Sequence, residues 1–231
     1  MITSHAKKII NLFIFLVFVS GSIYYIHYLK KSEYFPIRKV NVYGIQAMDR
    51  DDVQQIVTPL VNSGFFAVKV ESVREKLLKM PWASQVTVRR VWPDQVDVTV
   101  SEKKPLARWN ETSLLSESGE LFKPALSSFP ENLPEFVGPE GEQISMTKYY
   151  LLANQILAPL HFQITHFELV PQATWNMILS NGIKLVLSYK DILTQLEGFV
   201  KVYPKIIGDR GSQVEYIDLR YSNGFAVRWK V

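Results

Sequence analysis

The side chains best suited to holding a metal ion are few in this sequence and are poorly spaced. The four histidines are His5, His27, His161 and His166, and the last two lie five residues apart. Ligands on one helix face lie four residues apart, and ligands on one strand face lie two apart, so neither spacing is met. The sequence has no cysteine, which excludes disulfides and thiolate metal sites. We therefore predict no metal and no cofactor.

Motifs that position a nucleophile or a phosphate group are also missing. The sequence has no G-x-S-x-G, no phosphate loop ending in Gly-Lys-Ser or Gly-Lys-Thr, and no H-E-x-x-H. The stretch Gly138-Pro139-Glu140-Gly141 follows a proline-rich loop and indicates a turn. Asp51 and Asp52 stand at a predicted helix start, where the helix dipole favours carboxylates. The sequence thus predicts no catalytic residues. An enzyme held in a membrane ranks third among the functions considered below, after a scaffold and an assembly factor.

The most regular pattern in the chain lies at its C-terminal end. Val214 to Tyr221 alternates between apolar and polar residues, which is the periodicity of a strand. A turn at Ser222-Asn223-Gly224 follows. The next strand then places four apolar residues on one face: Phe225, Val227, Trp229 and Val231. We predict a terminal pair of antiparallel strands.

A strand at this position can lie at the edge of a sheet, where its N–H and C=O groups are free. Charged residues such as Arg228 and Lys230 guard such an edge against pairing in one interpretation. In the other, an extended segment of a partner adds a strand there, with Tyr221 and Trp229 as aromatic anchors. Periodicity alone leaves both interpretations open.

Two basic pairs and several tryptophans are further candidates for a binding surface. Arg89-Arg90 and Lys103-Lys104 form either a patch for lipid or an acidic partner, or a plain solvated face. Large aromatic residues beside short strands are more often core than exposed anchors. The tryptophans concerned are Trp82, Trp92, Trp109 and Trp175.

The net charge of +4 is concentrated near the N-terminus. The first 35 residues hold four lysines and one glutamate, so the other 196 residues carry only about +1. A nucleic-acid surface needs basic residues on a folded face, so this distribution argues against one. It is typical of a membrane-proximal collar attracted to anionic lipid.

An uncharged stretch runs from Ile9 to Leu29. As a helix its 21 residues span about 31 Å, the thickness of a bilayer core. Lysines flank both ends, and tyrosines gather near the second end, as interface anchors do. These flanking residues are Lys7, Lys8, Lys30 and Lys31, with Tyr24, Tyr25 and Tyr28. We predict a transmembrane helix over residues 9–29.

Two alternatives apply to the same stretch. A signal peptide would be cleaved near Ser20-Gly21-Ser22, but the apolar run continues beyond that point. A helix buried in a soluble core is the other alternative. The lysine flanks alone do not decide the orientation of the helix in the membrane.

The chain after this stretch predicts two domains of mixed α+β class. Residues 35–104 read as strand, helix, helix, strand, strand, with a helix N-cap at Asp49 and a turn at Trp92-Pro93-Asp94. The second helix is predicted from about Val70 to Met80. Such a unit forms a small sheet covered on one face by two helices.

Residues 105–231 predict a mixed β-domain with two helices. Strands are expected at 106–109, 114–115, 121–122, 164–170, 175–179 and 183–187, before the terminal pair. Asn181-Gly182 is typical of a type I′ turn. Helices are expected at about 145–157 and 192–203, with Pro204 directly after the second. The four prolines Pro124, Pro130, Pro134 and Pro139 predict a loop.

A series of motifs runs through the chain after the apolar stretch. The most specific block comprises Met80-Pro81-Trp82, Val86 to Arg90, Val91-Trp92-Pro93-Asp94 and Pro105-Leu106-Ala107-Arg108-Trp109. Further motifs are Gly138-Pro139-Glu140-Gly141, Tyr203-Pro204 and Tyr216-Ile217-Asp218-Leu219-Arg220-Tyr221, with Gly224 and Trp229. In this order they resemble the bacterial FtsQ/DivIB family of cell division proteins.

The resemblance implies a single-pass inner-membrane protein of the division septum. Residues 1–8 are then a cytoplasmic tail, 9–29 the transmembrane helix, 35–104 a POTRA domain, and 105–231 a periplasmic β-domain. The implied function is a non-enzymatic divisome scaffold that links early and late division proteins. A POTRA-containing envelope assembly or chaperone factor is the alternative, although it would need several POTRA units or a following barrel.

The resemblance also implies partners and their site. The family binds FtsB, itself paired with FtsL, by strand addition at the end of the β-domain. The residues implied here are Arg220, Tyr221, Ser222, Asn223, Gly224, Phe225, Val227 and Trp229. Some relatives carry arginines just before the tryptophan that matches Trp175. Gln172-Ala173-Thr174 stands there in this chain, so a salt bridge to the partner at that point is not carried over.

Overall fold

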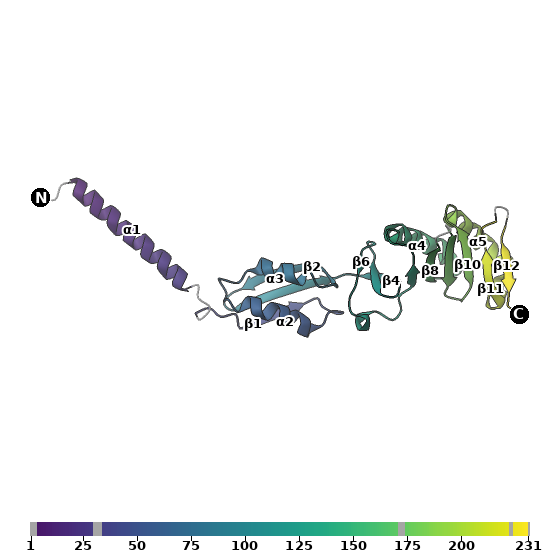
Figure 1. The fold of residues 1–231 in the computed structure, drawn as a ribbon, viewed down its shortest axis with the longest axis horizontal. Coiled ribbons are helices and arrows are strands. Elements are labelled where there is room, and N and C mark those ends of the chain that lie inside the picture. Colours follow the sequence, from purple (N-terminus) through teal and green to yellow (C-terminus); the bar gives the residue numbers. More distant parts are fainter. Residues whose placement is uncertain (1–3, 30–33, 171–173, 222–223, 231) are drawn as a thin grey trace. The chain divides into compact units, whose positions relative to one another are not determined.

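The computed structural model describes residues 4–29, 34–170, 174–221 and 224–230, and its chain divides into two compact units (Figure 1). The first unit is Met1–Glu102 and the second is Lys103–Val231. Both contain helices packed on strands, so the predicted α+β class is confirmed.

Helix α1 (Ser4–Leu29) contains the uncharged stretch. Its large apolar side chains from Leu12 to Phe18 are more than half exposed. Across the described residues, no helix combines the length and the hydropathy that a membrane crossing requires. Lys30 and Lys31, which were expected to flank the stretch, lie outside the described residues.

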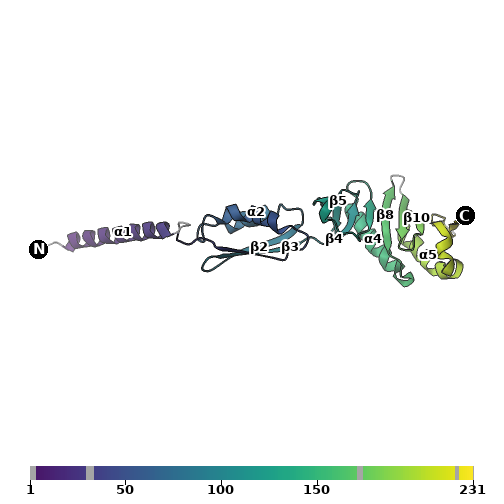
Figure 2. The ribbon, with the colours of Figure 1, turned by 90° about the horizontal axis from the view of Figure 1, so that it is seen from below.

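The first unit has the predicted order of strand, helix, helix, strand, strand. Its elements are β1 (Lys39–Tyr43), α2 (Arg50–Val61), α3 (Val70–Leu77), β2 (Ala83–Val91) and β3 (Gln95–Glu102). The central strand is β3, which pairs parallel with β1 and antiparallel with β2. Figure 2 shows α2 lying over one face of this sheet. The buried side chains between the layers are mainly valines, as the alternation of the strands predicts.

Two carboxylates hold the loops of this unit. The predicted N-cap Asp49 accepts a hydrogen bond from the Asp51 N–H at 2.8 Å, which confirms the start of α2. Glu102, at the end of β3, accepts hydrogen bonds from three consecutive backbone N–H groups, at 2.9 to 3.1 Å. Those groups belong to Gln46, Ala47 and Met48. Glu102 therefore ties the loop before α2 to the sheet.

One residue of each predicted basic pair forms an ion pair, and all but one of the four tryptophans named above are buried. Arg89 forms an ion pair with Asp97 at 3.2 Å, and Lys103 forms one with Glu120 at 2.8 Å. Of the tryptophans named above, Trp82, Trp109 and Trp175 are buried, as expected of core residues. Trp92 is different, because 62% of its surface is exposed.

The second unit is built on one mixed sheet. Its strands are β4 (Pro105–Trp109), β5 (Ser113–Ser116), β6 (Leu121–Phe122), β7 (Glu135–Val137), β8 (Ile164–Val170), β9 (Thr174–Leu179), β10 (Lys184–Ser188), β11 (Val214–Asp218) and β12 (Ala226–Trp229). They pair in the order β12-β11-β10-β9-β8-β7-β4-β5-β6. The helical segments are α4 (Gln143–Leu157), α5 (Ile192–Ile206), η1 (Leu126–Ser128), η2 (Ala158–Leu160) and η3 (Gly208–Gln213).

An aromatic stack lies at the centre of this unit. Trp175 of β9 is fully buried and stacks on Phe167 of β8, with ring centroids 4.6 Å apart. On its other side Tyr189 stacks at 5.8 Å, and Tyr149 of α4 packs at 5.5 Å. Aromatic rings bury more apolar surface than other side chains, so this stack fixes α4 against the middle of the sheet.

The expected proline loop contains a strand that the sequence does not predict. The three residues of β7 pair parallel with both β4 and β8, and so join the two halves of the sheet. The Arg108 N–H donates to the Pro134 carbonyl at 2.9 Å, and the Asn110 N–H donates to the Phe136 carbonyl at 2.9 Å. The sequence does not predict this strand because three residues are too few to show an alternating pattern and because prolines lie on both sides of them.

Two further predictions of local structure are wrong. Gly182 has φ of +84° but Asn181 does not have positive φ, so the turn is not type I′. The Gly182 N–H donates to the Leu179 carbonyl at 2.8 Å, which closes a turn that ends on glycine. Helix α5 continues through Pro204 to Ile206, because the Ile207 N–H returns to the Tyr203 carbonyl at 2.9 Å and Ile207 is buried.

Candidate functional site

Strand β12 is the last strand of the nine-stranded sheet. It pairs antiparallel with β11 along one edge, and among the described residues no strand pairs with its other edge (Figure 1). The predicted antiparallel pairing at the end of the chain is therefore present, with β12 outermost. The connection is longer than predicted, because β11 ends at Asp218 instead of Tyr221 and β12 begins at Ala226.

The direction of the backbone groups on β12 follows from one hydrogen bond. The Lys230 N–H donates to the Gln213 carbonyl at 2.7 Å, toward β11. Successive N–H groups of a strand point to opposite edges. The N–H of Arg228 therefore also faces β11, whereas those of Val227 and Trp229 face the open edge. These two residues offer the donors and acceptors that a further strand would use.

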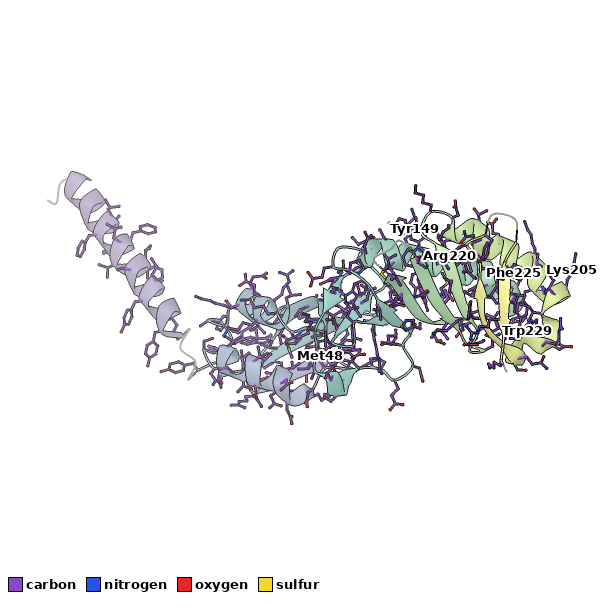
Figure 3. All side chains as sticks on the ribbon, turned by 45° about the vertical axis from the view of Figure 1, so that its right-hand side comes forward. Met48, Tyr149, Lys205, Arg220, Phe225 and Trp229 are labelled. Atoms are coloured by element: carbon purple, nitrogen blue, oxygen red, sulfur yellow. The ribbon has the colours of Figure 1, made fainter. Side chains whose placement is uncertain are left out.

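A groove of about 540 Å³ lies beside this edge, between α5 and the chain that leads into β12. Helix α5 contributes Thr194, Gln195, Gly198, Phe199, Val202 and Ile206. The other wall consists of Leu219, Tyr221, Gly224, Phe225 and Val227. Figure 3 marks Phe225 and Trp229 at the β12 end of the sheet. Backbone donors and an apolar groove are thus next to each other.

Sequence patterns indicate the residues on the strand side of the groove but not those on the helix side. The available signal was Gly198, which interrupts an amphipathic helix on the row formed by Thr194 and Val202 at four-residue spacing. A Cβ built on Gly198 has no atom within 4 Å. The missing side chain therefore leaves open space next to the buried Phe199.

The Arg220 side chain is bound by the Asp218 carboxylate. The Asp218 carboxylate accepts hydrogen bonds from Nε of Arg220 at 2.9 Å, from its Nη2 at 2.7 Å and from its backbone N–H at 3.1 Å. Asp218 is buried, whereas half of the Arg220 side chain is exposed. The Arg220 guanidinium lowers the pKa of Asp218 through its hydrogen bonds, and the Asp218 carboxylate raises the pKa of Arg220 in the same way. This pair ends β11 and directs the chain toward Tyr221.

The two faces of β12 are occupied differently. The Arg210 guanidinium lies over the Trp229 ring, 4.9 Å from its centroid, so Trp229 is only 37% exposed. On the opposite face Arg228 forms an ion pair with Glu215 of β11 at 3.0 Å. Arg228 is thus engaged with the neighbouring strand and does not cover the open edge. Tyr221 is 61% exposed.

Some of the remaining residues predicted for the site are described by the structure, and others are not. Gly224 has φ of +156°, which favours glycine, and a Cβ there would meet no atom within 4 Å. Ser222 and Asn223 lie outside the described residues, as do Gln172 and Ala173. Thr174 is the first residue of β9.

The histidines that are described do not form a metal site. His166 Nδ1 lies 3.1 Å from the Glu135 carboxylate, and His161 borders a separate cavity at the end of α4. Within residues 4–29, 34–170, 174–221 and 224–230, no three histidine or carboxylate side chains gather around one point.

Comparison with known proteins gives two family matches. Residues 107–220 match the model "Cell division protein FtsQ/DivIB, C-terminal", and residues 35–103 match "POTRA domain, FtsQ-type". Tyr221 and all of β12 lie just beyond the first match.

Curated relatives are similar over most of the chain. A protein named "Cell division protein FtsQ" from Coxiella burnetii is 35% identical over 179 residues, which are 78% of this chain and 74% of the relative. Proteins of the same name from Xanthomonas campestris and Alcanivorax borkumensis are 33% and 34% identical over 85% of this chain, and over 70% and 77% of their own lengths.

The Asp218–Arg220 pair predicts a dependence of stability on pH. A carboxylate with a lowered folded pKa stabilises the fold above its unfolded pKa, near 3.8 for Asp218, and this contribution is lost as the pH falls through the folded value. We expect Asp218→Asn to lower the melting temperature at neutral pH and to make its decline in acid shallower than in the wild type. The control is Glu197→Gln, which changes an exposed carboxylate on α5. If the Asp218→Asn and wild-type curves stay parallel, the pair does not contribute in this way.

Proposed function

The chain belongs to the FtsQ/DivIB family of cell division proteins, and from that premise we propose that it recruits the FtsB–FtsL pair by strand addition on the open edge of β12. The observation that carries this proposal is an outermost strand with outward N–H groups at Val227 and Trp229, next to an apolar groove. FtsB supplies the added strand in this scheme, and FtsL accompanies it.

The contact residues proposed are those of the chain that enters and forms β12. Val227 and Trp229 provide backbone donors and acceptors, and Tyr221 provides an exposed aromatic surface. Arg220 is bound by Asp218, and half of its side chain is exposed. The full proposed set is Arg220, Tyr221, Ser222, Asn223, Gly224, Phe225, Val227 and Trp229.

The edge and the groove contribute free energies of binding of comparable size. A backbone hydrogen bond exchanged with water contributes a net of about 1 kcal/mol, and a few of them also set the register of the added strand. Fully burying one aromatic side chain contributes roughly 3 kcal/mol. The groove accepts such a side chain from the partner, and we assign part of the affinity to each.

The role that follows is that of a scaffold. The β-domain holds the FtsB–FtsL pair, and the chain links early and late division proteins at the septum without catalysing a reaction. The proposed location is the inner membrane, with residues 1–8 cytoplasmic, residues 9–29 spanning the bilayer and both folded units periplasmic. The support for the anchor is the 21-residue uncharged stretch with lysines at both ends.

Substitution of Val227 tests strand addition at the backbone. Val227→Pro removes one outward N–H, which an edge strand tolerates, whereas Val227→Ala keeps that N–H and removes only side-chain packing. We expect Val227→Pro to weaken capture of the FtsB–FtsL pair by about tenfold or more, because a hydrogen bond is lost and the proline ring obstructs the incoming strand. Capture is measured by titration, with melting temperatures to check folding. Equal binding by the proline and alanine variants would show that no strand adds at this edge.

Substitution of Gly198 tests the groove from the helix side. Gly198→Leu fills the open space without changing any residue of β12, and it replaces a poor helix former by a good one. We expect intact folding and a loss of FtsB–FtsL affinity of about tenfold, with Gly198→Ala causing a smaller loss. Unchanged affinity in Gly198→Leu would exclude the groove from the interface.

The orientation in the membrane is tested by fusion. Alkaline phosphatase joined after Val231 is active only where disulfides form, outside the cytoplasm. We expect an active fusion, and we expect deletion of residues 9–29 to abolish its activity. An inactive fusion to the intact chain that is nevertheless well expressed would reverse the proposed topology.

A further inference from the structure

Four aromatic rings gather at the end of the first unit where β1 and β3 begin. We call this set, Phe35, Phe65, Phe66 and Trp92, the aromatic cluster. Trp92 lies 5.7 Å from Phe35, 5.5 Å from Phe65 and 6.2 Å from Phe66, measured between ring centroids. Phe35 and Phe66 are 5.0 Å apart. The rings come from three separate segments of the chain and form one continuous apolar surface.

Only part of this surface is needed for folding. Phe65 is buried, but Phe66 is 41% exposed and Trp92 is 62% exposed. The core of the first unit is formed elsewhere, by the valines of α2, α3 and the sheet. An exposed tryptophan grouped with a second exposed ring indicates a surface that contacts something outside the domain.

The cluster is held in place by backbone hydrogen bonds. The Phe65 N–H donates to the Phe35 carbonyl at 2.8 Å, and the Arg38 N–H donates to the Asp94 carbonyl at 2.9 Å. The first bond joins the loop after α2 to the segment before β1, and the second joins that segment to the turn between β2 and β3. The exposed rings are thus presented by a fixed platform.

The length of the chain before the cluster limits what it can contact. Five residues lie between Leu29, the last residue of α1, and Phe35, and a fully extended chain over these six Cα–Cα steps reaches about 20 Å. If α1 crosses the membrane, as proposed above, the cluster stays within about 20 Å of the bilayer surface. A membrane interface is where tryptophan and other aromatic rings collect, because their apolar rings leave water while their polar edges stay hydrated.

The charges around the cluster fit an anionic lipid surface. Arg38 and Lys39 are exposed at the start of β1, and Nη1 of Arg90 donates to the Phe65 carbonyl at 3.4 Å. Asp94 is the acidic residue of the adjoining turn. Lys39 also lies near Asp97, which is paired with Arg89. Arg38, Lys39, Arg89 and Arg90 against Asp94 and Asp97 give this end of the unit a positive balance, which anionic headgroups attract.

We propose that the aromatic cluster is a membrane contact, in which Trp92 and Phe66 enter the headgroup layer of the bilayer that holds α1. In this arrangement the end of the first unit that carries the aromatic cluster contacts the membrane, and the contact restricts rotation of the unit relative to α1. This inference rests on the proposed membrane anchor, and it assigns Trp92 a role distinct from that of the tryptophans in the cores.

Quenching of tryptophan fluorescence by brominated lipid tests the contact. The full chain is reconstituted into vesicles of phosphatidylethanolamine and phosphatidylglycerol that carry bromine either near the headgroups or near the chain ends. We expect the shallow bromines to quench the wild type, and Trp92→Phe to lose most of that quenching. The matched control is Trp229→Phe, which removes the other partly exposed tryptophan and is expected to leave the quenching unchanged. Equal melting temperatures confirm that Trp92→Phe is folded.

The outcomes separate this proposal from the one on which it rests. Flotation of the vesicles after an alkaline wash reports the anchor, and a chain that does not float overturns both proposals. A chain that floats but shows the same quenching with and without Trp92 overturns the cluster proposal alone. Shielding of Trp92 from aqueous iodide without quenching by bromine also overturns it, because a protein partner would then cover the cluster.

Discussion

The constraint on which the proposed function depends is that strand β12 is outermost in its sheet, with one edge that no strand pairs with in the part of the chain that the structure describes. A sheet that does not close on itself has an outermost strand, and the outward N–H and C=O groups of that strand bind water, side chains or another strand. Proteins that avoid this exposure place a helix, a proline or an inward-pointing charge at the edge. In this chain Arg228 is paired with Glu215 on β11, and Val227 and Trp229 direct their N–H groups outward.

The neighbouring elements make this edge more selective than an exposed strand alone. At the end of β11, Asp218 binds Arg220 at three points. One wall of the groove consists of Leu219, Tyr221, Gly224, Phe225 and Val227, and α5 with Gly198 forms the other. A partner must therefore match both a strand register and an apolar groove. Either requirement alone would admit many extended or apolar peptides, and their combination restricts the choice.

The sequence predicts those parts of the fold and of the site whose structure is determined by residues within the same segment. The alternation of valines and the Asp49 cap predict the first unit, and alternation also predicts the terminal strands, because each pattern reports on its own segment. The strand β7 depends on β4 and β8, which are far away in the sequence. The passage of α5 through Pro204 goes with the burial of Ile207 in the core of the second unit, which the local pattern does not reveal. The groove is missed for the same reason. From the sequence alone Gly198 is an unfavourable residue in a helix, and the reason for it is visible only in the fold, where Leu219, Tyr221, Gly224, Phe225 and Val227 form the other wall of the groove.

Hydrogen exchange at single amides of β12 tests the central claim most directly. In the free protein the N–H groups of Ala226 and Arg228, which face β11, should exchange slowly, and those of Val227 and Trp229 should exchange fast. Adding the FtsB–FtsL pair is predicted to protect Val227 and Trp229 while Ala226 and Arg228 change little. If the complex forms and the exchange of Val227 and Trp229 stays fast, the partner does not add a strand to β12 and the account of this site is contradicted.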